Sequence, residues 1–472
     1  MSSHLPATDG LVPASIPRFG TDGVRGVANT ELTPEVVLSL GRAAARVLPG
    51  GTFLVGRDTR RSGLQLFGAL SAGLAAEGAD VIDLGVLPTP AVALASAERG
   101  LPAAMISASH NPFQDNGVKF FSAGGRKLAD AIEHQIDGIY GGLMARTLSE
   151  PALVVDADRS GSNVGWVHED GGEAVRSYVS HITATLEGRR LAGLHVVVDA
   201  ANGALSAIAG PVLASLGATV TTLHDQPNGT NINADCGSTH LRSLIDEVRR
   251  SGADLGLGFD GDADRCLACD SAGELIDGDQ IMAMLALDLR SRSQLVADTV
   301  VVTVMTNLGF KLAMQREGLT VVETKVGDRY VLEALEAGRY SLGGEQSGHV
   351  IMTRHASTGD GLLTGIAVMD LMARTGRSLS SLGSVMVRLP QVLRNVRDVD
   401  RSKLETAGVL WEEVRAAESL MAGSGRVLIR PSGTEALVRV MVEAPTAEQA
   451  ETVTAHLCGV VERELGAPSP AR

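Results

Sequence analysis

The feature of the sequence that most constrains its fold is one pattern that occurs three times along the chain. In each copy, an apolar strand-like run leads through a loop into an amphipathic helical stretch, a glycine ends the helix, and a second strand-like run follows. The first strands begin at Thr52, Leu194 and Thr299, and the second strands begin at Gly78, Gly217 and Gly318. This order of elements is typical of a βαβ unit. The second strands start 139 and then 101 residues apart, so we predict that each unit belongs to a domain of its own.

The last part of the chain does not repeat this pattern. It predicts strands at 391–396, 426–429 and 438–443 and helices at 401–421 and 447–465. We therefore predict an α/β protein with three similar βαβ-based mixed α/β domains and a C-terminal α+β domain. The expected domains are residues 16–158, 159–257, 258–378 and 379–466, with disordered tails at 1–15 and 467–472. A length of 472 residues suggests about three domains, and the unlike C-terminal module raises that number to four.

The composition excludes several classes of protein. The 41 Lys and Arg against 55 Asp and Glu give a net charge of −14, whereas nucleic acid and anionic membranes attract basic surfaces, so we expect neither as a partner. Four cysteines are too few for a disulfide framework. Cys266 and Cys269 lie in a strand-like run, where a spacing of three separates their side chains, which favours reduced structural thiols over a metal site.

The sequence also contains no predicted targeting or membrane segment. Residues 1–19 hold no apolar stretch of the signal-peptide type. The apolar run 281–287 is far shorter than the ~20 residues that a membrane-spanning helix needs. We therefore expect a cytoplasmic protein.

The first segment that suggests chemistry runs from Met105 to Phe121. An apolar strand leads into Ser109-His110-Asn-Pro, and Lys119 follows ten residues after the serine. A serine where a strand meets a loop, with cationic side chains near it, suits a nucleophile or a carrier of phosphate. The alternative is a polar turn that ends at Asn-Pro. A Ser-His-Asp triad is disfavoured, because adjacent side chains cannot easily place the imidazole against the hydroxyl.

The second segment carries Asp260, Asp262 and Asp264, followed by Arg265. Three carboxylates at alternate positions share one side of an extended loop and repel each other unless a cation lies among them. Oxygen ligands of this kind favour Mg²⁺ or a similar divalent ion. An EF-hand is excluded, because the sixth loop position is Arg265 rather than glycine and the twelfth is Ser271 rather than glutamate. The alternative is an acidic hairpin turn.

The third segment, residues 343–349, places Glu345, Ser347 and His349 among glycines. Glutamate can accept two hydroxyl protons and serine can bind a third group, as recognition of a polyol or sugar requires. The alternative is a glycine-rich turn. A similar polar loop, 325–330, follows a strand shortly before it.

The fourth segment is Arg430-Pro-Ser432-Gly433-Thr434-Glu, between two predicted strands of the last module. An arginine fork, two hydroxyls and a glycine N–H form a compact binding site for an oxyanion such as phosphate. The alternative is an ordinary hairpin loop. Two further loops, 18–26 and 56–60, add cations to the first domain or are solvated turns.

Together these segments resemble the α-D-phosphohexomutase family, which includes phosphoglucomutases and phosphomannomutases. The matching segments occur in the family's order and are FGTDGVRG (19–26), SASHNP (107–112), FDGDADR (259–265), GEQSGH (344–349) and RPSGTE (430–435). They cover nearly the whole chain, to about Leu465. The resemblance implies three similar α/β domains and a fourth, different one around a central active-site cleft, which agrees with the three repeats and the unlike C-terminal module.

The resemblance also implies a phosphoserine enzyme. Ser109 would carry the phosphoryl group, and one Mg²⁺ per subunit would be held by Asp260, Asp262, Asp264 and a phosphate oxygen on Ser109. The cationic surroundings of the phosphoserine match Arg25, His110, Lys119 and Arg265. The sugar-binding positions match Glu345, Ser347 and His349. The loop that grips the phosphate not being transferred matches Arg430, Ser432, Gly433 and Thr434. The group that accepts the proton of the sugar hydroxyl stays open among Lys119, His110 and His349.

The substrate that the resemblance implies is a small hexosamine phosphate. The loop around Gln346, where phosphomannomutase relatives often have Met, and the segment 19–26 look most like the glucosamine branch of the family. We expect reversible conversion of glucosamine 6-phosphate to glucosamine 1-phosphate for UDP-N-acetylglucosamine synthesis, primed by glucosamine 1,6-bisphosphate or glucose 1,6-bisphosphate. Alternatives are a phosphomannomutase or phosphoglucomutase, a metal-dependent phosphatase, and a non-catalytic sugar-phosphate-binding protein. The resemblance also allows a homodimer.

Overall fold

The computed structural model describes residues 17–20, 22–149, 161–432 and 437–466. The chain divides into two compact units, which we describe separately: residues 1–304 with 322–383, and residues 305–321 with 384–472. None of the helices in the described part of the chain combines the length and the apolar character that crossing a lipid bilayer requires.

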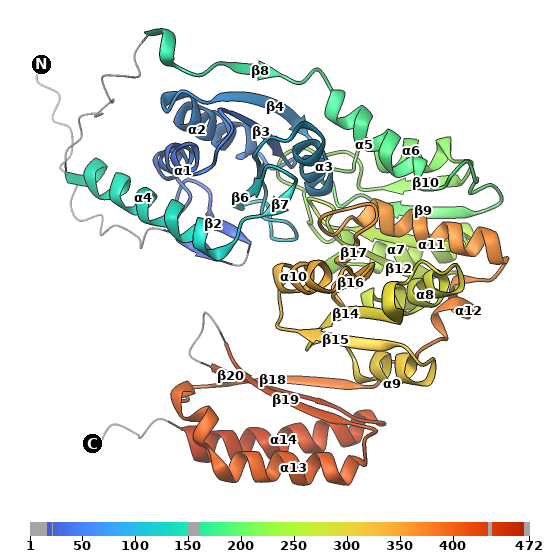
Figure 1. Ribbon diagram of the computed structural model, residues 1–472. Helices are drawn as coiled ribbons and strands as arrows, with labels where there is room; N and C mark the ends of the chain where they lie inside the picture. Colours follow the sequence, from blue (N-terminus) through green and yellow to red (C-terminus); the bar gives the residue numbers. More distant parts are fainter. Residues whose placement is uncertain (1–16, 21, 150–160, 433–436, 467–472) are drawn as a thin grey trace, which may run out of the picture. The chain divides into compact units, whose positions relative to one another are not determined.

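The first sheet has eight strands (Figure 1). Its strands, in spatial order, are β1 (Phe19–Gly20), β2 (Gly23–Val27), β6 (Asp115–Ser122), β5 (Ala103–Ile106), β3 (Thr52–Arg57), β4 (Asp80–Val86) and β8 (Val167–Glu169), with β7 (Arg126–Lys127) beside β6. Its helices are α1 (Pro34–Val47), α2 (Gly63–Ala76), α3 (Thr89–Arg99) and α4 (Asp130–Ser149). Strand β3 pairs in parallel with β4 and β5, whereas β6 is antiparallel to β5 and β2. Side chains from α1, α2, α4 and the sheet form one buried core.

The second and third sheets are smaller. The second contains β10 (Thr219–Leu223), β9 (His195–Asp199), β11 (Leu255–Phe259), β12 (Cys266–Asp270) and β13 (Leu275–Ile276), with helices α5 (Glu173–Ala184), α6 (Ala209–Ser215) and α7 (Arg242–Ser251). The third contains β15 (Thr320–Thr324), β14 (Thr299–Thr303), β16 (Leu342–Gly344) and β17 (Val350–Met352). Helices α8 (Gly278–Ser291), α10 (Asp328–Gly338), α11 (Gly361–Thr375) and α12 (Leu379–Gly383) belong to the same part of the chain. All three predicted strand–helix–strand units are confirmed, as β3–α2–β4, β9–α6–β10 and β14–α9–β15, with α9 at Leu308–Arg316.

The end of the second domain can be inferred from the second sheet, which runs from β9 to β13 along the chain. The boundary predicted between residues 257 and 258 falls inside β11, and the sheet that contains β9 continues to β13. We therefore propose that the second domain extends to about residue 276. The cysteines of β12, Cys266 and Cys269, are buried and form no disulfide.

Three of the candidate loops occupy the same place in their sheets. Residues 107–114 link β5 to β6, residues 260–265 link β11 to β12, and residues 345–349 link β16 to β17. The strands before these loops, β5, β11 and β16, are parallel to β3, β9 and β14, respectively. The strands after the loops, β6, β12 and β17, are antiparallel to the strands before them. The loops therefore all leave the carboxyl end of a parallel strand, which is the edge where α/β sheets bind ligands.

Besides α9, which lies in its residues 305–321, the second unit is an antiparallel sheet with two helices, as predicted for the last part of the chain. Its strands are β18 (Gln391–Arg397), β20 (Leu437–Glu443) and β19 (Arg426–Pro431), and its helices are α13 (Gly408–Met421) and α14 (Ala447–Leu465). The predicted continuous helix over 401–421 is wrong at its start. Residues 401–406 form a short 3₁₀ helix, and Ala407 leaves the helical region with ψ of 77°. The break leaves the carbonyl of Leu404 paired, because it accepts from the backbone N–H of Ala407 at 3.4 Å and from the indole N–H of Trp411 at 2.8 Å.

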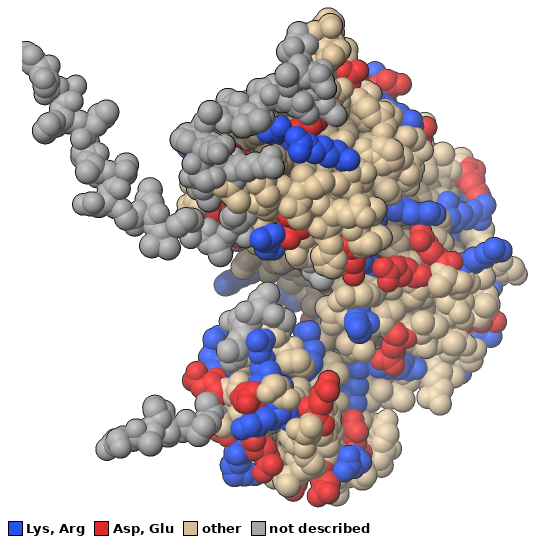
Figure 2. Space-filling view, turned by 60° about the vertical axis from the view of Figure 1, so that its left-hand side comes forward, with Lys and Arg blue, Asp and Glu red and all other residues tan. Residues whose placement is uncertain are grey.

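Charged side chains of both signs are interspersed on the face that Figure 2 shows. The acidic residues of the candidate metal loop are not part of that surface pattern. Asp260 and Asp262 are 0% exposed and Asp264 is 5% exposed. The burial of three carboxylates within one loop needs a physical explanation.

Helices α1 and α2 cross at glycines, which gives the first prediction. A Cβ atom on Gly73 would lie 2.1 Å from the carbonyl oxygen of Leu38, whereas Gly68 of the same helix faces open space. Alanine favours a helix over glycine by about 1 kcal/mol. We expect Gly73→Ala to destabilise the protein by about 1–3 kcal/mol because the helices must separate. The control Gly68→Ala should leave stability unchanged or raise it. Thermal unfolding of both variants measures the difference, and equal midpoints would contradict the close crossing.

Candidate active site

The centre of the candidate site is the buried carboxylate loop between β11 and β12. The carboxylates of Asp260, Asp262 and Asp264 each offer an oxygen within 4.8 Å of the others. One oxygen of Asp262 and one of Asp264, both Oδ1, are buried and have no hydrogen-bond partner. Buried carboxylates this close are stable only with compensating positive charge. The donor set and its orphaned oxygens thus fit a divalent cation that prefers oxygen ligands.

The pKa values within this loop diverge. Burial, Asp264 and Asp262 together raise the pKa of Asp260 well above its usual range. Burial also acts to raise the pKa of Asp264, but His349, Lys119 and Arg265 outweigh it and hold that pKa well below the usual range. Without a bound cation, Asp260 therefore holds a proton more tightly than Asp264 does.

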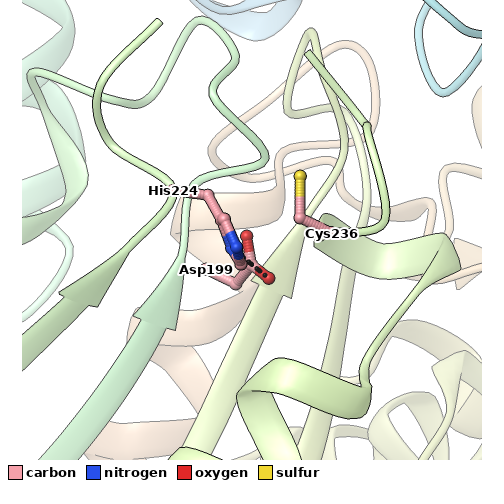
Figure 3. Close-up of side chains that lie close together, drawn as sticks. All are labelled: Asp199, His224 and Cys236. Carbon is pink, nitrogen blue, oxygen red and sulfur yellow. Dashed lines mark ion pairs between the residues drawn. The ribbon is translucent and has the colours of Figure 1, made fainter. Parts of the chain in front are cut away.

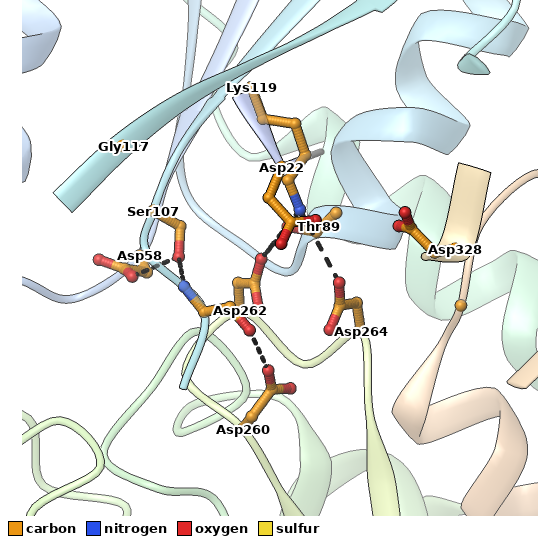
Figure 4. A network of polar contacts seen from close by, with 12 residues as sticks. Asp22, Asp58, Thr89, Ser107, Gly117, Lys119, Asp260, Asp262, Asp264 and Asp328 are labelled. Atoms are coloured by element: carbon orange, nitrogen blue, oxygen red, sulfur yellow. Dashed lines mark hydrogen bonds and ion pairs between the residues drawn. The ribbon is translucent and has the colours of Figure 1, made fainter. Parts of the chain in front are cut away.

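Ser109 follows β5 of the first sheet and meets this loop, whose three carboxylates are labelled in Figure 4. Its hydroxyl donates a hydrogen bond of 2.6 Å to Asp260 Oδ2, across 151 residues of sequence. The side chain is buried, and the backbone is in the left-handed region with φ of 52°. A non-glycine residue in this conformation carries strain that the surroundings must hold in place.

Arg60 makes several of the contacts that keep Ser109 in this conformation. Its guanidinium is 0% exposed, is paired with Asp58 at 2.9 Å, and donates to the carbonyl oxygens of Ser109 (2.9 Å) and Asn111 (2.9 Å). It also donates to the carbonyls of Pro112 and Asp115. One buried side chain thus replaces the backbone partners that the 107–114 loop lacks.

Other contacts fix the serine from its remaining sides. The hydroxyl of Ser107 accepts from the backbone N–H of Ser109 at 2.9 Å and donates to Asp58 at 2.6 Å. Asn233, from the second domain, donates through Nδ2 to the Ser109 carbonyl at 2.8 Å. The serine is therefore held by side chains of two domains.

The serine loop and the carboxylate loop touch directly. A Cβ atom on Gly261 would lie 2.6 Å from the carbonyl oxygen of Ser109, so only glycine allows the two loops to approach this closely. Thr89, at the first turn of α3, donates to Asp262 Oδ2 at 2.6 Å, and its backbone N–H donates to the Asp262 carbonyl at 2.9 Å. The carboxylate loop is thus anchored to the first domain.

The predicted cations do surround this centre. Lys119 Nζ lies 3.7 Å from Asp262 and 3.8 Å from Asp264, and Arg265 Nε lies 3.7 Å from Asp264 Oδ1. His110 Nδ1 lies 3.4 Å from the Ser109 hydroxyl and 3.2 Å from Arg265 Nη1.

The pKa values of His110 and Lys119 are shifted in opposite directions. Burial, Arg265 and Arg25 together lower the pKa of His110. Burial alone would lower the pKa of Lys119, but Asp262, Asp264 and Asp22 outweigh it and raise that pKa. Arg25 has a buried Nε without a hydrogen-bond partner.

The third loop also reaches the carboxylates. His349 Nδ1 lies 3.5 Å from Asp264 Oδ2, and His349 Nε2 accepts from the backbone N–H of Gly359 at 3.0 Å. Glu345 accepts from the N–H of Gly327 at 3.1 Å, and the buried hydroxyl of Ser347 has no hydrogen-bond partner. An unpaired buried hydroxyl beside a partly exposed carboxylate leaves hydrogen-bonding capacity for a polar ligand.

The fourth loop lies in the second unit. Arg430 of β19 pairs in register with Arg439 of β20, and burial together with Arg439 lowers the pKa of Arg430. Ser432 is buried, and its carbonyl accepts from Arg401. A cavity of about 560 Å³ is lined by residues 399–402, Pro431 and Ser432. The adjacent guanidinium groups of Arg430 and Arg439 favour an anion beside β19 and β20. Gly433 and Thr434 lie outside the described residues.

Several residues of the site were not identified from the sequence. Asp58 and Arg60 lie in the loop 56–60, which was noted only for its cations. Thr89 and Asn233 stand alone in segments without a motif, so nothing local distinguishes them. Arg439 faces Arg430 only because the strands pair in that register.

Comparisons with known proteins place the chain among relatives of the same four-domain type. Four family models of phosphoglucomutase/phosphomannomutase match the chain: alpha/beta/alpha domain I at residues 17–145, domain II at 176–273, domain III at 277–388 and the C-terminal domain at 393–459. Relatives named phosphoglucosamine mutase are 53% identical in Kineococcus radiotolerans and 52% in Streptomyces avermitilis; each match covers 95% of this chain and 99% of the relative.

Solved structures share the fold. A phosphoglucomutase/phosphomannomutase family protein of Burkholderia thailandensis is 24% identical with a TM-score of 0.76, covering 95% of this chain and 98% of that one. N-acetylphosphoglucosamine mutase of Aspergillus fumigatus, solved in complex with GlcNAc-6P and magnesium, is 18% identical with a TM-score of 0.65 and 96% coverage of both chains.

The role of Arg60 can be tested. We expect Arg60→Ala to destabilise the protein by about 3–5 kcal/mol, because Asp58 stays buried without its partner. Burial already acts to raise the pKa of Asp58, and removal of Arg60 raises it further. A carboxyl whose pKa is raised on folding costs stability only once pH exceeds its unfolded value of about 4, so the loss should shrink in acid.

Arg61→Ala is the matched control, because the side chain of this neighbouring arginine is exposed. Urea unfolding at several pH values measures both variants. A loss of stability in Arg60→Ala no larger than in Arg61→Ala would contradict the holding role of Arg60.

Proposed function

Because the chain belongs to the phosphoglucomutase/phosphomannomutase family, we propose that it reversibly converts glucosamine 6-phosphate to glucosamine 1-phosphate. The activity is an isomerase activity of the phosphoglucosamine mutase type. The observation that carries the substrate assignment is the identity of 53% to a relative of that name over nearly the whole length of both chains.

We propose Ser109 as the residue that carries the phosphoryl group. The bond from its oxygen to phosphorus breaks as a sugar hydroxyl oxygen bonds to the same phosphorus, and the hydroxyl proton passes to a base. The bisphosphate formed then turns end for end, and its other phosphate returns to Ser109. The buried position of Ser109 against three carboxylates supports this role, because transfer within a closed site excludes hydrolysis by water.

We propose that Asp260, Asp262 and Asp264 hold Mg²⁺ together with a phosphate oxygen on Ser109. When bound, the ion supplies positive charge that stabilises the phosphoryl group during transfer. Support comes from the orphaned carboxylate oxygens and from the close hydroxyl of Ser109.

The cationic side chains near Ser109 would also stabilise the phosphoryl group with positive charge. Arg265, Lys119 and Arg25 offset the charge of a phosphoserine, which approaches −2 near neutral pH. Of the three candidate proton acceptors, His110 is the one whose pKa is lowered, whereas carboxylates raise the pKa of Lys119 and His349 against their burial. This favours neutral His110 as the group that accepts the hydroxyl proton.

The remaining loops would bind the rest of the substrate. We propose that Glu345, Ser347 and His349 contact sugar hydroxyls, and that Arg430 and Ser432, with Gly433 and Thr434, hold the phosphate that is not transferred. A hexose 1,6-bisphosphate would serve as the primer that first phosphorylates Ser109.

Two measurements on Ser109 test the covalent step. We expect Ser109→Ala to lose mutase activity by several orders of magnitude, and peptide mapping of the wild-type protein to find an acid-stable phosphate on Ser109. Ser177→Ala is a suitable control, because Ser177 is a partly exposed serine whose hydroxyl donates to Glu98. Full turnover by Ser109→Ala would favour a phosphatase that uses the carboxylates directly.

The substrate is tested by coupled assays with a bisphosphate primer present. We expect kcat/KM for glucosamine phosphate to exceed the values for glucose and mannose phosphates. A much larger kcat/KM for mannose or glucose 1-phosphate would overturn the substrate assignment and leave the family mechanism intact.

Binding of Mg²⁺ should depend on pH in a defined direction. Since burial and two carboxylates raise the pKa of Asp260, the cation must displace a proton, so its affinity should rise with pH above the usual Asp value of about 4. The metal-free protein should conversely lose stability as pH rises through the raised pKa. Thermal unfolding with and without Mg²⁺ across pH measures both effects. Asp260→Asn should flatten the pH dependence, and stronger stabilisation by Mg²⁺ in acid would contradict this prediction.

A further inference from the structure

A second cluster of metal-ligating side chains lies in the second domain, apart from the three carboxylates. Asp199 ends β9, His224 directly follows β10, and Cys236 directly precedes the short 3₁₀ helix at Gly237–Thr239 (Figure 3). One oxygen, one imidazole nitrogen and the sulfur all lie within 4.8 Å of one another. None of these residues belongs to the reaction described above.

The backbone holds the cluster firmly. Asp199 Oδ1 accepts from the N–H of Ala201 at 2.9 Å, and Asp199 Oδ2 accepts from the N–H of Gly237 at 3.0 Å, which fixes the plane of the carboxylate. The carbonyl of His224 accepts from the N–H of Asn202 at 2.6 Å. Because the first two ligands stand at the ends of paired parallel strands, their spacing is set by the sheet.

The contacts among the three side chains do not suit a cysteine nucleophile. His224 Nδ1 faces Asp199 Oδ2 at 3.0 Å, whereas a catalytic imidazole must face the sulfur. Cys236 Sγ instead accepts a long contact of 4.0 Å from Asn202 Nδ2. The sulfur is buried, and the His224 side chain is 30% exposed, so solvent reaches the cluster from the imidazole side.

The donor chemistry separates this cluster from the carboxylate loop. One sulfur, one nitrogen and one oxygen form a ligand set typical of Zn²⁺, and three ligands leave the fourth tetrahedral position for water. Three carboxylates, in contrast, suit Mg²⁺.

We propose that Asp199, His224 and Cys236 bind a Zn²⁺ ion at a site separate from the carboxylate loop. The ion would displace the proton of the Cys236 thiol, which passes to solvent, and would bind Nδ1 of a neutral His224 that carries its ring proton on Nε2. It would join the ends of β9 and β10 to the segment that precedes Cys236. Asn233 of that segment donates to the Ser109 carbonyl, so the ion would stiffen one support of the serine. The proposal does not depend on the substrate of the enzyme.

Titration of the full chain with Co²⁺, in the presence of excess Mg²⁺, tests the site. Cobalt bound to a thiolate gives an intense charge-transfer absorption in the near ultraviolet, which cobalt bound to carboxylates alone does not give. We expect one equivalent of Co²⁺ to produce this band in the wild-type protein, and Zn²⁺ to abolish it by displacement.

Matched variants identify the ligands. Cys236→Ala should abolish the band, whereas Cys269→Ala, which removes an equally buried sulfur from the neighbouring strand β12, should retain it. His224→Asn keeps all cysteines and should weaken Co²⁺ binding by more than the ~10–100-fold typical of an outer-shell change. A wild-type protein without the band, a band that survives in Cys236→Ala, or unchanged affinity in His224→Asn would each overturn the proposal.

Discussion

The hydrogen bond between Ser109 and Asp260 is the contact on which the rest of the site depends. It joins a loop of the first sheet to a loop of the second at 2.6 Å, and it lies beside two more buried carboxylates. Such a concentration of negative charge in a buried place is unstable on its own. The lysine, the arginine and the histidine around it, and the cation that the carboxylates are suited to bind, follow from that need. The same positive charge is what a phosphoryl group requires in transfer.

The three α/β domains contribute to this centre in the same way. Each provides a loop that leaves the carboxyl end of a parallel strand and returns as an antiparallel one. One loop holds the serine, the next the carboxylates, and the third His349, Glu345 and Ser347. A single architectural unit, used three times, thus supplies three different chemical functions, because loops can change while the strands that hold them do not.

The parts that were predictable from the sequence are those determined by neighbouring residues. Hydrophobic periodicity located the βαβ units, and the alternate spacing of Asp260, Asp262 and Asp264 placed the carboxylates together within one loop. The supports of the site were not predictable in this way. Arg60 reaches four carbonyl groups about fifty residues later, three in the 107–114 loop and one at the start of β6, and Asn233 reaches Ser109 from another domain. The error near residue 407 has a local cause instead: the apolar periodicity continues, but the backbone turns at Ala407, and the carbonyl of Leu404 accepts from the indole N–H of Trp411 as well as from Ala407.

The distance between Ser109 and Asp260 along the chain also has a consequence for synthesis. The 151 residues between them take about 8–30 s to be made at usual elongation rates. During that interval the serine loop has only the partners of its own domain, chiefly Arg60 and Ser107, and lacks Asn233 and the carboxylates. The nascent first domain can therefore shape the loop but cannot present the complete site proposed for phosphoryl transfer. That site is complete only once the later domains have emerged, and this delay separates folding of the serine domain from assembly of the site.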